Sequence, residues 1–401
     1  MRLQRAPELV DRQMEREIER FLEFTGRDVW KDQIEKLNQQ LSSPKFYFYK
    51  VWLRDRSTFL IALGEYLELV KQGKSIWRNA SPLLKYYSKQ LFILNFVAKN
   101  SCEIAKKKIL GKFRTPKEIN SFLFELQIAT HFLIKGFDVL FVDLESSGKG
   151  QTFDFLIESD GTEGEIECKR KSVDAGRKIT REGFYLLSDA VVSRVYGRGQ
   201  NMALNITCKI SLGKNQNDFQ NYALKIQEAV QARQNSVELS QNLSAEILYL
   251  PEEVRIHSNE EAAKMLAPSL PQNAYCAIRS SGDGTVIPRA LSETKDKVLK
   301  SIFDEIEDGS HQLTRKRPSM IACYIEDIEE EDWKDLKDES GLANMTATFF
   351  SKESNSHVNR VAYSSGPDFQ IAFQNNSTEN LSFKNLRAKF KVSEGFFSFS
   401  K

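Results

Sequence analysis

Two carboxylates and a lysine lie within one short stretch of the chain, on either side of a dipeptide that is typical of turns. Asp154 precedes the dipeptide Asp160-Gly161, and Glu167 and Lys169 follow it. An Asp-Gly pair between alternating apolar residues is a strong signal for a hairpin with a type I′ turn, whose two central residues need a positive φ. If this dipeptide is the turn, the pairing continues outward and places Asp154 opposite Glu167.

The expected register gathers charge on one face of the hairpin. Side chains alternate between the two faces of a strand, so Glu167 and Lys169 share a face and Cys168 points away. Glu165 lies on the charged face as well and is a weaker candidate. Like charges that face each other across strands destabilise a sheet by up to ~1 kcal/mol unless a positive group lies between them. That group is a divalent cation or Lys169, although a plain hairpin with a solvated charged face would contain the same residues.

A helix is expected directly before the hairpin. Thr115, Pro116 and Glu118 form a capping box with a proline at the first helical position, and apolar residues then recur at spacings of three and four. Glu125 borders the apolar stripe of this helix, where a charge needs a partner. A short apolar strand at 139–142 follows.

The order of these elements resembles the core of the PD-(D/E)XK nuclease superfamily, which has the restriction-endonuclease-like fold. The resemblance covers roughly residues 113–215 and rests on Glu125, on Asp154 and on the run Glu167-Cys168-Lys169. Phe153 stands where the family name has proline, a position that carries no chemistry. The resemblance implies an α/β protein whose core is a restriction-endonuclease-like mixed sheet.

The resemblance also implies a metal-dependent nuclease, expected to be an endonuclease with DNA as its substrate. Asp154 and Glu167 would bind Mg²⁺ or Mn²⁺, and the backbone carbonyl of Cys168 would add a third ligand. Lys169 would orient the attacking water or stabilise developing negative charge. Glu125 would act as an outer ligand or serve a second metal ion.

Basic residues follow the Glu-x-Lys strand. They could hold the phosphates that flank a scissile bond, or they could form a solvated helix entrance. The expected nucleic-acid contacts are Arg170, Lys171, Arg177, Lys178 and Arg181. Beyond them, a strand at 201–212 is expected as the next strand of the core sheet, and a helix at about 217–231 would close the domain.

Positive charge is concentrated in the N-terminal part of the chain. The formal net charge is only +2, but residues 43–115 contain 15 Lys and Arg against four acids. Aromatic residues are interleaved with this charge at 45–50 and 85–87. Basic clusters track phosphates and exposed rings stack on bases, so this segment could contact nucleic acid. A helical bundle with buried aromatics, or a surface for dimerisation or a partner protein, is the alternative.

At 401 residues the chain is long enough for two or three hydrophobic cores. We expect a basic helical domain at 1–112, the nuclease-like core at 113–235 and an α/β module of unassigned role at 236–401. This module completes the core sheet, mediates oligomerisation or reads a target. Its expected strands are 244–250, 274–279, 319–325 and 369–374, and its expected helices are 258–266 and 292–307.

The sequence contains neither a signal-peptide pattern nor an apolar run of about 18 residues, and its five cysteines are scattered. We therefore expect a cytoplasmic protein without a membrane partner. The alternative to a nuclease is a catalytically inactive subunit of the same fold that binds nucleic acid or takes part in an assembly. A homodimer or a complex with a partner protein is compatible with both functions.

Overall fold

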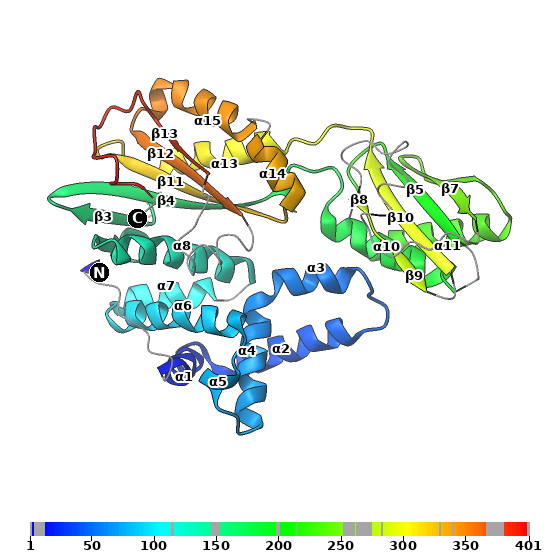
Figure 1. Cartoon of the computed structure of the whole chain (residues 1–401), viewed down its shortest axis with the longest axis horizontal. Helices are drawn as coiled ribbons and strands as arrows, with labels where there is room; N and C mark the ends of the chain where they lie inside the picture. The colour runs from blue at the N-terminus through cyan, green and yellow to red at the C-terminus, as the bar shows by residue number, and fades with distance from the viewer. Residues whose placement is uncertain are drawn as a thin grey trace. The chain divides into compact units, whose positions relative to one another are not determined.

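The structure is a computed structural model, and it shows an α/β protein with two mixed sheets (Figure 1). It describes residues 2–3, 13–113, 116–145, 153–197, 201–213, 215–251, 261, 275–281, 284–328, 330–338, 341–365 and 381–398. The contacts within the chain define two units. Unit 1 consists of Met1–Ile34, Thr58–Val173 and Leu299–Lys401, and unit 2 consists of Glu35–Ser57 and Asp174–Val298.

Unit 1 is built around a mixed sheet with the strand order β1-β2-β3-β4-β11-β12-β13. β3 and β4 form an antiparallel hairpin, and β4 pairs in parallel with β11. The strands are β1 (Arg2–Leu3), β2 (Asp138–Phe141), β3 (Phe155–Ser159), β4 (Thr162–Ser172), β11 (Ser319–Glu326), β12 (Val358–Ser365) and β13 (Leu381–Lys384).

Helices cover both faces of this sheet. α8 (Pro116–Ile134) lies on one face, and α13 (Val298–Gln312) and α15 (Gly341–Ser351) lie on the other (Figure 1). The apolar stripe of α8 is buried as its spacing predicts, with Phe122 and Leu126 fully covered. The remaining helices of the unit are α1 (Met14–Thr25), α4 (Thr58–Lys71), α5 (Ile76–Asn79), α6 (Pro82–Lys99), α7 (Glu103–Lys112), α9 (Val142–Glu145) and α14 (Glu330–Asp338).

The β3–β4 hairpin has the register expected from the sequence. Phe155 pairs with Ile166, so the positions next outward are Asp154 and Glu167. The two residues of the Asp-Gly turn have φ values of 51° and 75°. Both are positive, as a type I′ turn requires.

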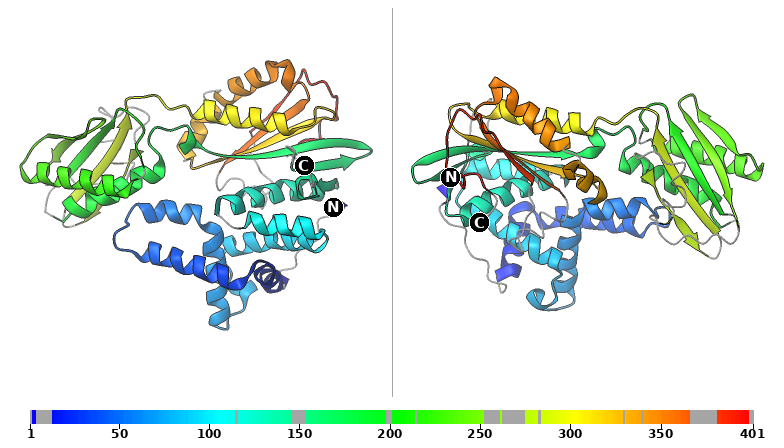
Figure 2. Two further views of the ribbon diagram at one scale, coloured as in Figure 1. Left: turned by 180° about the vertical axis from the view of Figure 1, so that it is seen from behind. Right: turned by 45° about the horizontal axis from the view of Figure 1, so that its top comes forward.

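Unit 2 contains a second mixed sheet with the strand order β6-β7-β5-β10-β8, and β9 also pairs with β10. α10 (Arg181–Val195) and α11 (Gln216–Gln231) pack side by side on one face of it (Figure 2). α3 (Tyr49–Arg56) contacts α10, and α2 (Arg27–Ser42) contributes residues to both units. The strands are β5 (Asn201–Cys208), β6 (Ser236–Ser240), β7 (Leu243–Leu250), β8 (Tyr275–Cys276), β9 (Arg279–Ser281) and β10 (Gly284–Ser292).

The expectation that the strand at 201–212 continues the core sheet is wrong. This segment forms β5, which pairs with β7 and β10 in the sheet of unit 2. The sheet of unit 1 is continued instead by β11, which follows unit 2 in the sequence. Alternation of apolar residues identifies a strand but not its partner, because pairing is decided by which segments pack together.

The other expected elements are distributed over both units. The expected strands at 244–250 and 319–325 are confirmed as β7 and β11, the helix at 217–231 as α11, and the strand at 139–142 as β2. The helix expected at 292–307 begins later, as α13, and β8 and β9 lie where one strand was expected at 274–279. The strand expected at 369–374, all but one residue of the helix at 258–266, and the cap residue Thr115 lie outside the described residues.

The two units divide the chain differently from the three successive segments expected, since each unit is assembled from separate stretches of the sequence and most of unit 2, Asp174–Val298, interrupts unit 1. Part of the C-terminal segment does complete the sheet that contains the hairpin, through β11, β12 and β13. Within the described ranges, no helix combines the length and the apolar character that a membrane crossing requires.

Candidate functional site

Asp154 lies directly before β3, and its carboxylate reaches across the hairpin. Its Oδ2 accepts a hydrogen bond of 2.7 Å from the backbone N–H of Cys168. Its own carbonyl oxygen accepts hydrogen bonds from the backbone N–H groups of Val142, at 3.0 Å, and Asp143, at 3.4 Å. These contacts hold Asp154 between β4 and the start of α9.

Glu167 and Lys169 form an ion pair on β4. Glu167 is only 2 % exposed, and its Oε1 lies 2.7 Å from Nζ of Lys169. The amide of Gln312, the last residue of α13, bridges the pair: its nitrogen donates to Oε1 of Glu167 at 3.0 Å and its oxygen accepts from Lys169 at 2.5 Å. The second oxygen of Glu167, Oε2, is buried and has no hydrogen-bond partner among the described residues.

Gly309 allows α13 to approach this ion pair closely. A Cβ atom at this position would lie 3.2 Å from Cε of Lys169 and 3.5 Å from Cγ of Glu167. The first of these distances is shorter than an ordinary van der Waals contact. The backbone of α13 therefore covers the Glu-x-Lys segment and limits the positions that Lys169 can take.

Glu125 lies on α8, is 8 % exposed and pairs with a lysine. Nζ of Lys112, the last residue of α7, lies 2.7 Å from Oε2 of Glu125 and 3.5 Å from Oδ2 of Asp143. The charge of Lys112 also acts on Asp154. Lys112 is thus the charged partner that the position of Glu125 beside the apolar stripe led us to expect.

Lys112 and Gln312 were not among the residues expected from the sequence. Lys112 is one of several lysines near the end of α7, and Gln312 lies beyond the whole of unit 2. Neither belongs to a motif, so only their proximity in the folded chain identifies them.

Burial raises the pKa values of the three candidate carboxyl groups. The pKa of Glu167 rises from its ordinary value of 4.5 to about 7, because burial outweighs the opposing effect of Lys169. The pKa of Asp154 rises well above its ordinary value through burial and then through the charges of Glu167 and Glu125. Burial also raises the pKa of Glu125, although the charge of Lys112 opposes the shift. The cluster therefore needs more positive charge if all its carboxyls are to be ionised.

The site offers a hard divalent cation a pair of carboxylates rather than a complete set of protein ligands. No group of three or more His, Cys, Asp or Glu residues in the described part of the chain is arranged to hold a metal ion. Mg²⁺, however, is usually held by one or two carboxylates together with waters and substrate oxygens. Asp154 and Glu167 form such a pair, and the partnerless Oε2 of Glu167 is a free ligand atom.

Glu165, the weaker candidate, is fully buried and makes other contacts. Its Oε2 accepts a hydrogen bond of 2.7 Å from the backbone N–H of Thr314. Its Oε1 accepts hydrogen bonds from the hydroxyl of Thr314 and, at 3.3 Å, from Arg317. Glu165 thus anchors the chain that follows α13.

The expected nucleic-acid contacts in unit 1 are both paired with acids. Arg170 forms an ion pair with Glu326, and its guanidinium lies 5.9 Å from the ring centroid of Tyr324. Nζ of Lys171 lies 2.8 Å from Oε2 of Glu305. Contact with phosphates would require these two side chains to exchange or share their partners.

Two of the three expected contacts in unit 2, Arg177 and Arg181, lie near tyrosines. Arg177 donates a hydrogen bond to the hydroxyl of Tyr275. Arg181 donates to the hydroxyl of Tyr185 at 3.4 Å and lies over its ring at 5.7 Å. The side chain of Lys178 has no ion-pair partner among the described residues. The role of these three residues in nucleic-acid binding stays a prediction.

Most aromatic residues in the basic N-terminal segment are buried. Phe48, Trp52, Tyr86 and Tyr87 are each less than 9 % exposed, whereas Tyr47 is 41 % exposed. Phe48 belongs to the hydrophobic core of unit 2. Packing therefore accounts for the four buried rings, whereas Tyr47 is exposed and has Lys50 and Arg279 over its ring.

Comparison of the chain with protein-family models, with curated proteins and with solved structures finds no match. The function of the protein is therefore inferred from the carboxylate cluster itself. We use this name for Glu125, Asp143, Asp154 and Glu167 with the two lysines Lys112 and Lys169.

Proposed function

We propose that this protein is a metal-dependent nuclease that hydrolyses phosphodiester bonds, with DNA as its substrate. The observation that carries the proposal is the register of the β3–β4 hairpin, which puts Asp154 and Glu167 at neighbouring positions, with Lys169 beside them. These are the residues by which the sequence resembles the PD-(D/E)XK nucleases. The resemblance is the reason for preferring phosphodiester hydrolysis to other metal-assisted reactions.

Charge balance supports a divalent cation in the carboxylate cluster. Four carboxylates and two ammonium groups leave a formal charge of −2 when every group is ionised. Burial makes such an excess unfavourable around Glu125, Asp154 and Glu167, and the raised pKa values of these three carboxyls reflect it. One divalent cation, Mg²⁺ or Mn²⁺, would neutralise the cluster.

Asp154, Glu167 and the backbone carbonyl of Cys168 would hold the metal ion. When bound, the ion would supply positive charge for the scissile phosphate and for the attacking water. Lys169 is held by Glu167 and Gln312, so the direction of its N–H donors is restricted. It would donate to the attacking water or to a phosphate oxygen as negative charge develops there.

Glu125 would assist from outside the metal's ligand shell. Its bond to Lys112 occupies Oε2, and the same lysine reaches Asp143. Glu125 therefore balances charge rather than serving as a direct ligand of a second metal ion.

A second candidate function is a catalytically inactive subunit that binds nucleic acid or takes part in an assembly. The observation that favours it is the internal pairing of the cluster: Lys169 pairs with Glu167 and Lys112 pairs with Glu125. Such pairs partly neutralise the carboxylates without a metal ion. A protein with this arrangement could keep its fold after losing catalysis.

Incubation of supercoiled plasmid and of labelled single-stranded DNA with Mg²⁺ or Mn²⁺ distinguishes the two functions. We expect metal-dependent cleavage by the wild type, loss of cleavage in Lys169→Ala, and unchanged cleavage in the exposed control Lys316→Ala. Folded wild type that retains DNA in a gel shift but does not cut it would support the inactive subunit. A folded wild type that neither cleaves nor retains DNA would contradict both the nuclease and a DNA-binding subunit.

A further inference from the structure

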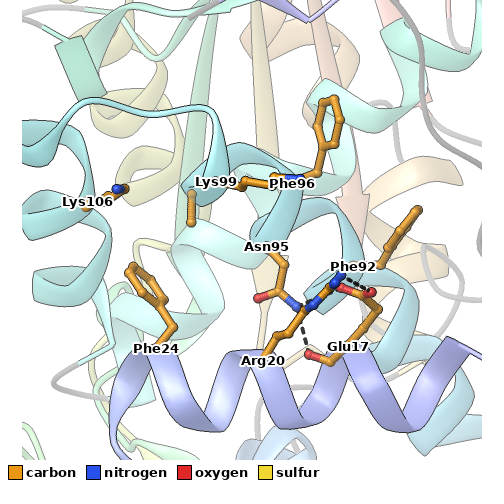
Figure 3. A pocket seen from close by; sticks show the side chains of 9 residues that line it. Glu17, Arg20, Phe24, Phe92, Asn95, Phe96, Lys99 and Lys106 are labelled. Atoms are coloured by element: carbon orange, nitrogen blue, oxygen red, sulfur yellow. Dashed lines mark hydrogen bonds and ion pairs between the residues drawn. The ribbon is translucent and has the colours of Figure 1, made fainter.

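A pocket of about 500 Å³ lies within unit 1, between α1, α6 and the start of α7 (Figure 3). None of the residues that line it belongs to the carboxylate cluster. Pockets that enclose small ligands have volumes of about 300–1,000 Å³. The space is therefore sufficient for a ligand of the size of a mononucleotide.

Aromatic rings form the apolar part of this pocket. Phe24 comes from α1, and Phe92 and Phe96 come from α6. Phe92 and Phe96 are four residues apart and so lie on one side of the helix. All three are partly exposed rather than buried in the core. Accessible ring faces of this kind stack on planar groups such as nucleobases.

Asn95 presents a hydrogen-bond acceptor of defined orientation. Its amide nitrogen donates to the carbonyl oxygen of Glu17 at 2.7 Å and to Oε2 of Glu17 at 3.1 Å. These two bonds fix the amide, so that its oxygen points away from Glu17 and toward the side of Phe24 (Figure 3). That oxygen has no donor among the described residues, and it can accept a hydrogen bond from an N–H group on the edge of a base.

The lining of the pocket carries an excess of positive charge. Arg20, Lys99 and Lys106 line it, against the single carboxylate of Glu17. Glu17 is 1 % exposed and is already neutralised by Arg20 at 2.7 Å. Lys99 is exposed and has no carboxylate within ion-pair distance in the described part of the chain, and Lys106 pairs only with the exposed Glu103. A phosphate group can therefore bind Lys99 and displace Glu103 from Lys106.

We infer that this pocket binds a nucleoside phosphate. The base stacks on Phe24 and donates an N–H to Asn95, and the phosphate binds Lys99 and Lys106. An inorganic anion would leave the rings unused, and an uncharged aromatic compound would leave the lysines unused. The site goes beyond the proposed nuclease activity and does not depend on it.

Isothermal titration calorimetry on the full chain tests this inference. The titrations contain EDTA, so that no divalent cation loads the carboxylate cluster, and the probes are AMP, GMP, CMP, UMP, adenosine, inorganic phosphate and benzoate. We expect at least one monophosphate to bind at one site per chain and about tenfold more tightly than adenosine, phosphate or benzoate. Absence of binding by every monophosphate at millimolar concentration, or equal binding of benzoate or phosphate, would overturn the inference.

Three substitutions locate the bound nucleotide. Phe24→Leu keeps an apolar side chain but removes the ring, and Lys99→Gln removes the charge; each should weaken binding about fivefold or more. Lys89→Gln removes an exposed charge from the same helix outside the pocket and should leave binding unchanged. Equal weakening by Lys89→Gln and Lys99→Gln would overturn the assignment.

Glu167→Gln separates this site from the proposed active site. Nucleotide affinity should be the same in this variant as in the wild type, whether or not the protein cleaves DNA. A loss of affinity in Glu167→Gln would place the nucleotide at the carboxylate cluster and overturn the inference. Circular dichroism of each variant shows that it is folded.

Discussion

Glu167 has one carboxylate oxygen bound to Lys169 and a second, Oε2, buried without a partner among the described residues. Leaving a buried acceptor unsatisfied costs about 1–3 kcal/mol. The same residue has a pKa raised to about 7 by burial. At the scale of single residues, these two features agree with a site that accepts a cation, because a cation would satisfy Oε2 and favour the ionised form.

Lys112→Met tests the ion pair that neutralises Glu125. The substitution keeps most of the side-chain volume but leaves Glu125 and Asp143 without the ammonium group between them. We expect a loss of about 3 kcal/mol in the free energy of unfolding, because a buried charge loses its partner. Urea unfolding in the absence of metal ions measures this loss in the free energy of unfolding. The exposed Lys107→Met on the same helix is the control, and equal stability of the two variants would contradict the role of the pair.

Gln312→Leu tests the bridge between Glu167 and Lys169. If the protein is a nuclease, loss of a residue that orients a catalytic group should lower the cleavage rate about 10- to 100-fold. The effect should appear in kcat rather than in KM, because Gln312 does not contact the substrate in this mechanism. Steady-state cleavage of a labelled duplex measures both constants. His311→Ala, an exposed neighbour, should cleave at the wild-type rate.

At the scale of secondary-structure elements, β4 is the strand on which the site is assembled. Its N-terminal half pairs with β3, and its residues from Glu165 to Ser172 pair with β11. Helix α13 approaches it at Gly309, and the C-terminal segment packs on it at Gly164. The candidate site is therefore held by elements that come from widely separated parts of the sequence.

Gly164→Ala tests the packing of the C-terminal segment on β4. A Cβ atom there would lie 2.6 Å from a ring atom of Phe396 and 2.9 Å from one of Phe397. Both rings are buried, so they must shift, and we expect a loss of about 1–3 kcal/mol in stability. Denaturant unfolding gives the value. Gly111→Ala, where no atom lies within 4 Å of the added Cβ, should be neutral or slightly stabilising, and a similar loss there would contradict this explanation.

At the scale of the whole molecule, the larger segment of unit 2, Asp174–Val298, is an insertion between two neighbouring strands. The chain leaves unit 1 at Val173 and returns to it at Leu299, and β4 and β11 pair in parallel on either side of this interval. Gly309 and Gln312 both follow the insertion. The contacts of α13 with Glu167 and Lys169 therefore require the long-range pairing of β4 with β11 to form.

The pH dependence of global stability tests the burial of Glu167. Its pKa is about 7 in the folded protein against an ordinary value of 4.5, so the folded state binds this proton more tightly than the unfolded state. The resulting stabilisation is complete below pH 4.5 and is lost as the pH rises to about 7. We expect the metal-free wild type to lose on the order of 3 kcal/mol more than Glu167→Gln between pH 4.5 and 8.

Urea unfolding at several pH values in EDTA measures this difference. If the free energies of unfolding of the wild type and Glu167→Gln changed with pH in the same way, the raised pKa of Glu167 would be contradicted. If Mg²⁺ binds at the cluster, it should stabilise the wild type more at pH 8 than at pH 5, because the ion competes with the proton.

The sequence by itself determined the local parts of this protein. The Asp-Gly turn, the register that sets Asp154 beside Glu167 and the buried stripe of α8 all follow from interactions between residues close in the chain. Turn geometry and the periodicity of apolar residues are sufficient to specify such features.

Only the tertiary structure decided which distant groups meet these local parts. It assigned β5 to a second sheet and β11 to the first, and it brought Lys112 and Gln312 to the carboxylates. The reason is physical: a strand's alternation and a lysine's charge are the same whatever their partner. The partner is selected by which packing buries the apolar surface of the whole chain while pairing its buried polar groups.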